Sequence, residues 1–156
     1  MDVRPLADAD RATTRAWIRE RWGDDAMVGH GELFHPADHE GFVAGEWGGL
    51  VTYRVAGDGC EITLIEAATP GAGAGSALLS AVIDEARGRG CARVWLVTTN
   101  DNLHARSWYA RRGFTVVAVR AGAVDRARET LKPSIATHND ENGLPISDEI
   151  ELALSL

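Results

Sequence analysis

Residues 69–79, TPGAGAGSALL, place three glycines at alternate positions directly before an apolar run with helical spacing. Glycine lets successive backbone N–H groups turn toward one point, because no Cβ stands in their way. The start of a helix adds N–H groups without intrahelical partners and a partial positive charge. A phosphate or pyrophosphate is the ligand that such a loop suits best. The stretch therefore predicts an anion-binding turn that leads into a helix.

Two other phosphate-binding loops and one purely structural role compete with this interpretation. A P-loop requires Lys and then Ser or Thr after its last glycine, and the presence of Ser76 and Ala77 there excludes it. A dinucleotide-binding turn requires Gly-x-Gly-x-x-Gly, whereas the three glycines alternate and Ser76 occupies the final position. Asp101, near the end of the next strand, keeps that alternative open. The glycines could also serve only a tight turn and close packing.

The composition predicts a single domain over residues 1–156 with a core of its own. The chain is 45% hydrophobic, and a domain of this length buries about two thirds of its unfolded surface. A net charge of −7 without a basic run argues against nucleic acid and anionic membrane surfaces as partners, and favours a cationic acceptor. No stretch approaches the roughly 20 apolar residues of a membrane span. Two cysteines, Cys60 and Cys91, and the lack of a signal-peptide pattern indicate a reduced, cytoplasmic protein.

Hydrophobic periodicity predicts a mixed α/β sheet with helices on both faces. Antiparallel strands are expected first, then a helix, a parallel strand, another helix and two final strands. The expected strands are one ending at Pro5 and those at 42–46, 50–55, 61–67, 93–99, 114–119 and 149–154. The expected helices are 11–22, 75–87, 102–111 and 123–129, with Asp8 or Asp10 as the cap of the first. Gly48-Gly49 and residues 57–59 are the predicted hairpin turns, and residues 27–34 are ambiguous.

A second pattern follows the glycine stretch after one helix and one strand. In NLHARSWYARRGF, Asn102, Ala105, Tyr109 and Gly113-Phe114 stand at the spacing found in the GCN5-related N-acetyltransferases, abbreviated GNAT. EITLIEAATPGAGAGSALL, which contains the glycine stretch, resembles the acetyl-CoA segment of the same superfamily. Together the two patterns cover residues 61–114, and the first strand and helix and the late strand also fit. The resemblance to the GNAT superfamily thus spans nearly the whole chain.

The resemblance implies the GNAT, or acyl-CoA N-acyltransferase, fold with acetyl-CoA as the cofactor. In this fold the mixed central sheet splays into a V between two parallel strands, and acetyl-CoA lies in the gap. Its pantetheine would pair with the strand backbone of Ile65, Glu66 and Ala67. Its pyrophosphate would lie on the amides of Gly71, Ala72, Gly73, Ala74, Gly75 and Ser76. The family pattern begins with Gln or Arg three residues before its middle glycine, where this chain has Pro70, so the loop amides are expected to suffice.

The resemblance also implies chemical roles for Tyr109 and Asn102. Tyr109 matches the family tyrosine near the cofactor sulfur, where a phenol can protonate the departing thiolate. Its alternative role is packing against the cofactor. Asn102 matches the family asparagine that bonds pantetheine, and it is equally suited to capping the helix that follows.

The acceptor amine must be neutral to attack, so some group must take its proton, directly or through water. Glu61 is the candidate, because in a period-two strand it shares a face with Thr63 and Ile65. The alternative is a strand-end carboxylate in water. Glu66 ranks lower, since it points to the opposite face unless a bulge intervenes.

Other acidic and histidine residues have weaker patterns. Glu149 and Glu151 on the last strand are expected either to contact the acceptor or to form a solvated face. His35 and His39 have the spacing of two ligands on one helix face. Pro36 disfavours a helix there, and acetyl transfer needs no metal, so no metal site is expected.

Residues 131–147 contain two prolines with Asn, Asp and Gly, and a loop of this length inside a compact domain is usually functional or disordered. We expect it to cover the acceptor site. The predicted function is N-acetyl transfer from acetyl-CoA to a primary amine of a small molecule or peptide by direct attack. The alternative is a non-catalytic acetyl-CoA sensor or interaction module of the same fold. The sequence leaves the oligomeric state open, a homodimer being the commonest assembly.

Overall fold

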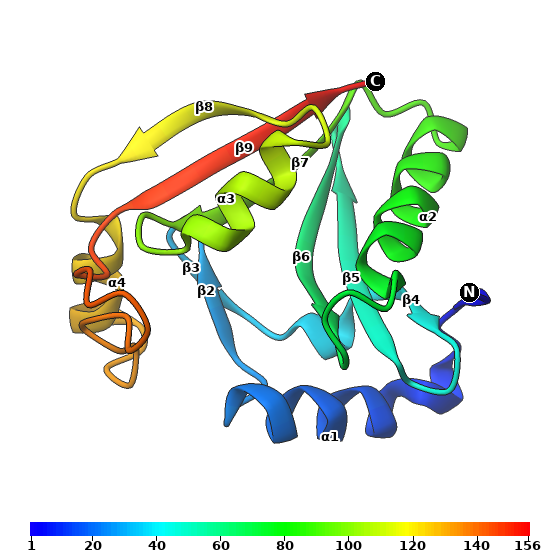
Figure 1. Cartoon of the computed structure of the whole chain (residues 1–156), viewed down its shortest axis with the longest axis horizontal. Coiled ribbons are helices and arrows are strands. Elements are labelled where there is room, and N and C mark those ends of the chain that lie inside the picture. Colours follow the sequence, from blue (N-terminus) through cyan, green and yellow to red (C-terminus); the bar gives the residue numbers. More distant parts are fainter. The chain divides into compact units, whose positions relative to one another are not determined.

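The computed structural model describes all 156 residues (Figure 1). Contacts between residues divide the chain into two compact units. Unit 1 comprises Met1–Met27, His35–Val94 and Leu156, and unit 2 comprises Val28–Phe34 and Trp95–Ser155. None of the helices combines the length and apolar character that crossing a membrane requires. A single domain over the whole chain stays a prediction.

Unit 1 is an antiparallel sheet in the order β1-β4-β5-β6 with two long helices. Its elements are β1 (Val3–Pro5), η1 (Asp8–Asp10), α1 (Arg11–Trp22), η2 (Pro36–Asp38), β4 (Glu40–Ala44), β5 (Gly49–Ala56), β6 (Gly59–Ala67) and α2 (Ala74–Gly88). The β5–β6 hairpin turns at Gly57 and Asp58, as predicted. The first predicted turn is longer than a Gly-Gly pair and spans residues 45–48, because β5 already begins at Gly49.

α1 ends where the sequence predicts but begins without the predicted side-chain cap. Gly23 closes the helix with a left-handed φ of 78°. Asp10 occupies the N-cap position, yet its carboxylate accepts from the backbone N–H of Ala7 at 2.7 Å and pairs with Arg4 at 2.8 Å. Asp10 is therefore the N-cap residue, one of the two predicted, but its carboxylate closes the preceding turn instead of capping the helix.

The two helices of unit 1 cover opposite faces of its sheet, as the sequence predicts (Figure 1). Leu50 of β5 packs with Trp17 and Ile18 of α1. A Cβ on the neighbouring Gly49 would lie 3.0 Å from Cδ1 of Leu78 in α2. Because adjacent residues of a strand point to opposite faces, α1 and α2 lie on different sides of β5. Glycine at position 49 lets the strand backbone approach α2 this closely.

β6 carries a β-bulge at Thr63. Tyr53 of β5 lies opposite Ile62, and the next residue back, Thr52, lies opposite Leu64. Thr63 is therefore the extra residue on β6. Such a bulge interrupts the alternation of faces along the strand.

The bulge changes which residues of β6 share a face. Glu61 lies opposite Arg54, and Glu66 lies opposite Leu50. Since Arg54 and Leu50 are an even number of residues apart, both glutamates lie on the face that α1 covers. Ile65, next to Glu66, points to the other face. The prediction that Glu61 and Ile65 share a face is therefore wrong, because it assumed unbroken alternation.

Unit 2 contains three strands in the order β7-β9-β8, a short hairpin and two short helices. Its elements are β2 (Met27–Gly29), β3 (Glu32–Phe34), β7 (Arg93–Thr99), α3 (Leu103–Ala110), β8 (Thr115–Arg120), α4 (Ala123–Thr130) and β9 (Glu149–Ser155). The ambiguous segment 27–34 is the hairpin β2–β3. His30 and Gly31 at its tip have φ values of 52° and 79°, the positive values that a two-residue hairpin turn requires.

β9 buries two glutamates, Glu149 at 7% and Glu151 at 8% exposure. Arg120 of β8 binds both carboxylates, at 3.1 Å to Glu149 and 2.7 Å to Glu151. The backbone N–H of His30 donates to Glu149 at 2.6 Å. Buried carboxylates require such partners. The expectation of a solvated face is therefore wrong for both residues.

Candidate functional site

The glycine loop forms the turn into a helix that the sequence predicts, and the space beside it is open. Gly71 and Gly73 have φ values of 80° and 88°, in the left-handed region that favours glycine. A Cβ at either position would meet no atom within 4 Å, so the space beside the loop is open. A side chain at these positions would therefore strain the backbone and intrude on that space.

The first turn of α2 offers backbone donors to an anion. Gly73 is the N-cap, no side chain caps the helix, and its first turn contains no acidic residue. The N–H groups of Ala74 and Gly75 have no intrahelical acceptor, and the helix dipole adds positive charge there. Pro70 contributes no N–H, so the donors come from the glycine side of the loop. The residues present thus fit a pyrophosphate group.

The strand that leads into this loop supplies the predicted pantetheine segment. Ile65, Glu66 and Ala67 are the last residues of β6. Burial raises the pKa of Glu66, and the charge of Arg21 on α1 partly opposes this effect. The structure brings these residues together with the glycine loop because they are contiguous along the chain.

Glu61 lies near the other end of β6 and is buried, with 4% exposure. Nε of Arg54 donates to its Oε1 at 2.7 Å. A buried carboxylate needs such a partner, so the alternative of a strand-end carboxylate in water is wrong. At about 3.3 Å per residue, Glu61 lies roughly 13 Å along the strand from Ile65.

Sequence reasoning missed a chain of hydrogen bonds at the β6 bulge. Oγ1 of Thr52 lies 2.8 Å from Oγ1 of Thr63, which lies 2.9 Å from Nδ1 of His39. Thr52 is fully buried, and Thr63 and His39 are half-buried. The sequence pattern indicated His39 only as a candidate metal ligand. A bulge does not change the hydrophobic pattern of a strand, so nothing in the sequence predicted the contact between His39 and Thr63.

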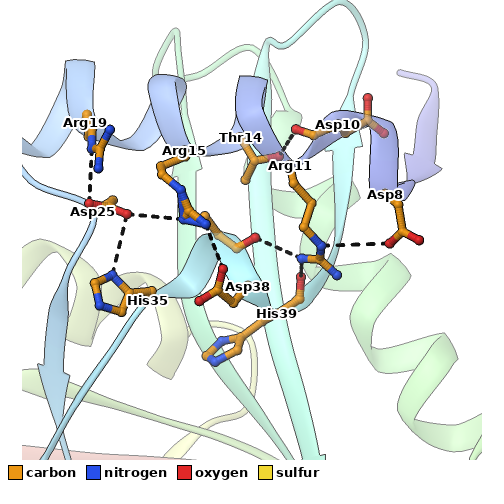
Figure 2. Close-up of polar contacts among 11 residues, drawn as sticks. Asp8, Asp10, Arg11, Thr14, Arg15, Arg19, Asp25, His35, Asp38 and His39 are labelled. Carbon is orange, nitrogen blue, oxygen red and sulfur yellow. Dashed lines mark hydrogen bonds and ion pairs between the residues drawn. The ribbon is translucent and has the colours of Figure 1, made fainter.

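The backbone beside His39 is held on α1 (Figure 2). Nη1 of Arg11 donates to the carbonyl oxygens of Ala37 and His39, at 2.9 and 3.3 Å. Arg15 donates to Asp38 at 2.7 Å. These contacts come from one face of α1 and fix η2 and the residue that follows it.

A buried carboxylate anchors the preceding segment to the same helix face (Figure 2). Asp25 accepts from Arg15 at 3.3 Å and from Arg19 at 3.1 Å, and Nδ1 of His35 lies 3.5 Å from it. Burial acts to raise the pKa of Asp25, but the Arg19 hydrogen bond and the charges of Arg19 and Arg15 together lower it. Asp25 and α1 therefore hold His35 and the start of η2 in place.

Tyr109 is buried in α3 of unit 2, with 4% exposure. Its ring makes edge-to-face contacts with Trp108 at 5.0 Å and Phe114 at 5.1 Å between centroids. Burial raises the pKa of Tyr109 well above its ordinary value, although the charge of Arg112 opposes this effect. The phenol therefore stays protonated at neutral pH and can donate a proton.

Asn102 caps α3, one of the two roles that the sequence left open. Its Oδ1 accepts from the backbone N–H of Ala105 at 3.1 Å. The Nδ2 group can still donate to another acceptor. Asn102 and Tyr109 are seven residues apart on α3, about two turns and roughly 10 Å along the helix axis.

The loop 131–147 is fastened to the turn between β7 and α3. Oδ1 of Asn100 accepts from the backbone N–H of Ser147 at 3.0 Å. Nδ2 of Asn139 donates to Oδ2 of Asp101 at 2.9 Å. These contacts hold the loop beside the start of the helix that carries Tyr109. Asp101, buried and bound by this loop, is therefore not a surface carboxylate that could meet a dinucleotide ribose.

Comparison with known proteins identifies the class to which this fold and this site belong. The sequence profile described as the Acetyltransferase (GNAT) family matches residues 3–114. The chain belongs to this family, which uses acetyl-CoA, and the predicted family, fold class and cofactor are thereby confirmed.

Individual relatives agree with this assignment. The uncharacterized protein YdhI of Bacillus subtilis is 38% identical over 138 residues, which cover 86% of this chain and 85% of that protein. A Bacillus subtilis acetyltransferase in complex with CoA has a TM-score of 0.66 at 18% identity, and the match covers 99% of both chains. A GNAT family acetyltransferase from Elizabethkingia anophelis with acetyl-CoA bound has a TM-score of 0.68 at 18% identity, covering 99% of this chain and 97% of that one.

Proposed function

We propose that this protein is an acetyl-CoA-dependent N-acetyltransferase of the cytoplasm that acts on a primary amine of a small molecule or peptide. The observation that carries the proposal is the glycine loop at the start of α2. Gly71 and Gly73 are left-handed, the space beside them is open, and no side chain caps the helix. Cys60 and Cys91 are free and buried, which fits a reducing compartment.

The loop and β6 bind the cofactor in this proposal. Backbone N–H groups of Gly71, Ala72, Gly73, Ala74, Gly75 and Ser76 hold the pyrophosphate, and the strand backbone of Ile65, Glu66 and Ala67 pairs with pantetheine. Asn102 of α3 donates from Nδ2 to pantetheine while its Oδ1 caps the helix. When bound, acetyl-CoA supplies a thioester whose carbonyl carbon an amine can attack.

Tyr109 acts as the proton donor for the departing thiolate. Its burial keeps the phenol protonated at neutral pH, and proton donation to the thiolate requires this form. The edge-to-face contacts with Trp108 and Phe114 fix the ring and therefore the position of the hydroxyl oxygen.

Glu61 receives the proton that the acceptor amine loses before it attacks. An ionised carboxylate can only accept, and Arg54 holds this one in the sheet at 2.7 Å. Because Glu61 is buried and engaged by Arg54, the proton reaches it through an intervening group or water rather than by direct contact with the amine.

A second candidate function is acetyl-CoA sensing without turnover. The observation that favours it is the same Arg54–Glu61 pair, since a buried carboxylate that serves only to balance the charge of Arg54 has no catalytic part. The two functions differ in whether an amine consumes acetyl-CoA.

The test combines calorimetry with an assay for free CoA. Acetyl-CoA is titrated into the protein without divalent metal, and CoA release is then followed with lysine, spermidine, kanamycin and a short peptide with a free N-terminus. Binding together with amine-dependent CoA release supports the enzyme. Binding without release from any amine supports the sensor, and tight binding of NAD or ATP in place of acetyl-CoA contradicts both functions.

A further inference from the structure

We infer that His39 is the group that takes the proton from the acceptor amine, with Thr63 at the β6 bulge as its positioning residue. The inference rests on the proposed function and names the intervening group between the amine and Glu61. It stands on the hydrogen-bond chain from His39 through Thr63 to Thr52, at 2.9 and 2.8 Å.

The bulge places this chain between Glu61 and the cofactor segment of β6. Thr63 is roughly 7 Å along the strand from Ile65, whereas Glu61 is roughly 13 Å away. The side chain of Thr63 meets Thr52, which shares the α1-covered face with Glu61. His39 therefore approaches β6 on the face of the candidate carboxylate and closer to the pantetheine segment.

The inferred step requires one tautomer of His39 and one direction of the hydrogen bonds. In the direction that suits a proton acceptor, Nδ1–H of His39 donates to Oγ1 of Thr63, and the Thr63 hydroxyl donates to Oγ1 of Thr52. Thr52 is fully buried, so water does not compete for this end of the chain. The tautomer leaves the lone pair of His39 on Nε2, the atom that can accept a proton.

Contacts with α1 hold the backbone of His39 beside β6. Its carbonyl accepts from Arg11, and the preceding η2 is tied to α1 through Asp38 and Arg15 (Figure 2). A proton acceptor must keep such a fixed position to act within hydrogen-bond reach of its donor.

Four ion pairs involve charged groups on the elements of unit 1 next to His39. They join Arg11 with Asp8, Arg15 with Asp38, Glu40 with Arg89, and Glu61 with Arg54. Imidazole ordinarily changes charge between about pH 5 and 8, whereas these carboxylates and guanidinium groups do not. Glu66, on the same face of β6, has a pKa that burial raises, so the loss of the limb in His39→Gln is what assigns it to His39.

The protons of the reaction balance when His39 takes one proton from the acceptor. Nε2 of His39 takes one proton from the ammonium form of the acceptor and passes it toward Glu61 and then to water. The neutral nitrogen forms the C–N bond to the acetyl carbon as the C–S bond breaks. Tyr109 protonates the thiolate, and the second proton of the nitrogen restores the Tyr109 phenol. The sum is one amide, one CoA thiol and one proton released.

The test measures CoA release from acetyl-CoA across the pH range of about 5 to 9, with the most active amine of the panel. His39→Gln should lower kcat/KM at neutral pH by about 100-fold and remove the acidic limb. His39→Ala should be partly rescued by added imidazole, which a merely structural role would not allow. His35→Gln, on the same segment but bound to Asp25, is the matched control and should keep the parent profile.

Variants of Thr63 test whether its hydroxyl positions His39 or whether its side chain only packs. Thr63→Val removes the hydroxyl but keeps the branched shape, so kcat should fall at least tenfold while acetyl-CoA affinity holds. Thr63→Ser keeps the hydroxyl and should restore most of the rate. Melting temperatures of all variants show that they are folded.

The outcomes distinguish this inference from the proposed function. If the parent releases CoA with an amine but His39→Gln keeps both its rate and its acidic limb, the His39 role is overturned and the acetyltransferase stands. If imidazole fails to rescue a folded His39→Ala, the role is likewise overturned. If the parent binds acetyl-CoA and no amine releases CoA, the acetyltransferase itself fails, and the His39 role falls with it.

Discussion

Tyr109→Phe separates the chemistry of Tyr109 from its packing. Phenylalanine keeps the ring contacts with Trp108 and Phe114, at 5.0 and 5.1 Å, and removes only the proton donor. We expect the free energy of unfolding to change by no more than about 1 kcal/mol. Tyr109→Ala would also lose the buried ring, at about 3–5 kcal/mol, which lowers Tm by roughly 6–20 °C.

The expected effect of Tyr109→Phe on the reaction is much larger than its effect on stability. Loss of a general acid should slow turnover about ten- to a thousandfold, which corresponds to roughly 1.4–4 kcal/mol in the barrier. Acetyl-CoA affinity should hold, because the ring remains. Since burial raises the pKa of Tyr109, its deprotonation should not produce an alkaline rate limb below about pH 10.

The assay pairs CoA release with calorimetric titration of acetyl-CoA on the same samples. Tyr53→Phe is the matched control, because it removes another buried phenol, one that accepts from Arg89 at 3.4 Å. The control should turn over at the parent rate. If Tyr109→Phe also does so, Tyr109 only packs, and the proton-donor role is refuted.

Four further predictions concern the glycine loop, the carboxylates Glu61 and Glu66, and the loop 131–147. Gly73→Glu should abolish acetyl-CoA binding in calorimetry, because it strains a left-handed position and brings a carboxylate to amides that hold pyrophosphate; unchanged affinity would make the glycines structural only. Glu61→Gln should shift or remove the acidic limb of the CoA-release rate, because it removes the carboxylate that receives the proton from His39, and an intact limb would mean that another group ends the proton path. Deleting residues 137–142 should raise KM for the amine and lower turnover in the same assay, and parent values would show that the loop does not cover the acceptor. Folded Glu66 holds its proton more tightly than the unfolded chain, so ionisation costs stability at neutral pH and the cost disappears as the pH falls toward about 4. Glu66→Gln should therefore raise Tm at pH 7 but not at pH 4, and an equal shift at both values would contradict the burial effect.

Most of the fold could be predicted because its signals are local. The left-handed glycines at 71 and 73, the helix stop at Gly23 and the strand 93–99 each follow from residue type and spacing. The hairpin at 27–34 could not be predicted in this way. Its turn contains His30 at a positive φ, and its backbone is held by Glu149, more than a hundred residues away.

Less of the candidate site could be predicted from the sequence, because part of it depends on strand register and on contacts between distant residues. The glycine loop and Tyr109 follow from short motifs, whereas the environment of Glu61 depends on register. The extra residue Thr63 moves the residues that follow it in β6 to the opposite face of the sheet, and no residue type predicts such a bulge. The same bulge brings Thr63 to His39, a long-range contact that periodicity does not encode.

The central claim is that the chain moves acetyl from acetyl-CoA to an amine, and mass spectrometry of the amine tests it most directly. The protein is incubated with acetyl-CoA and the amine panel, and acetylated amine and free CoA are quantified together. We predict that both appear in equal amounts with the parent and that neither forms above background with Gly73→Glu. Acetyl-CoA binding with no acetylated amine from any acceptor would contradict the claim.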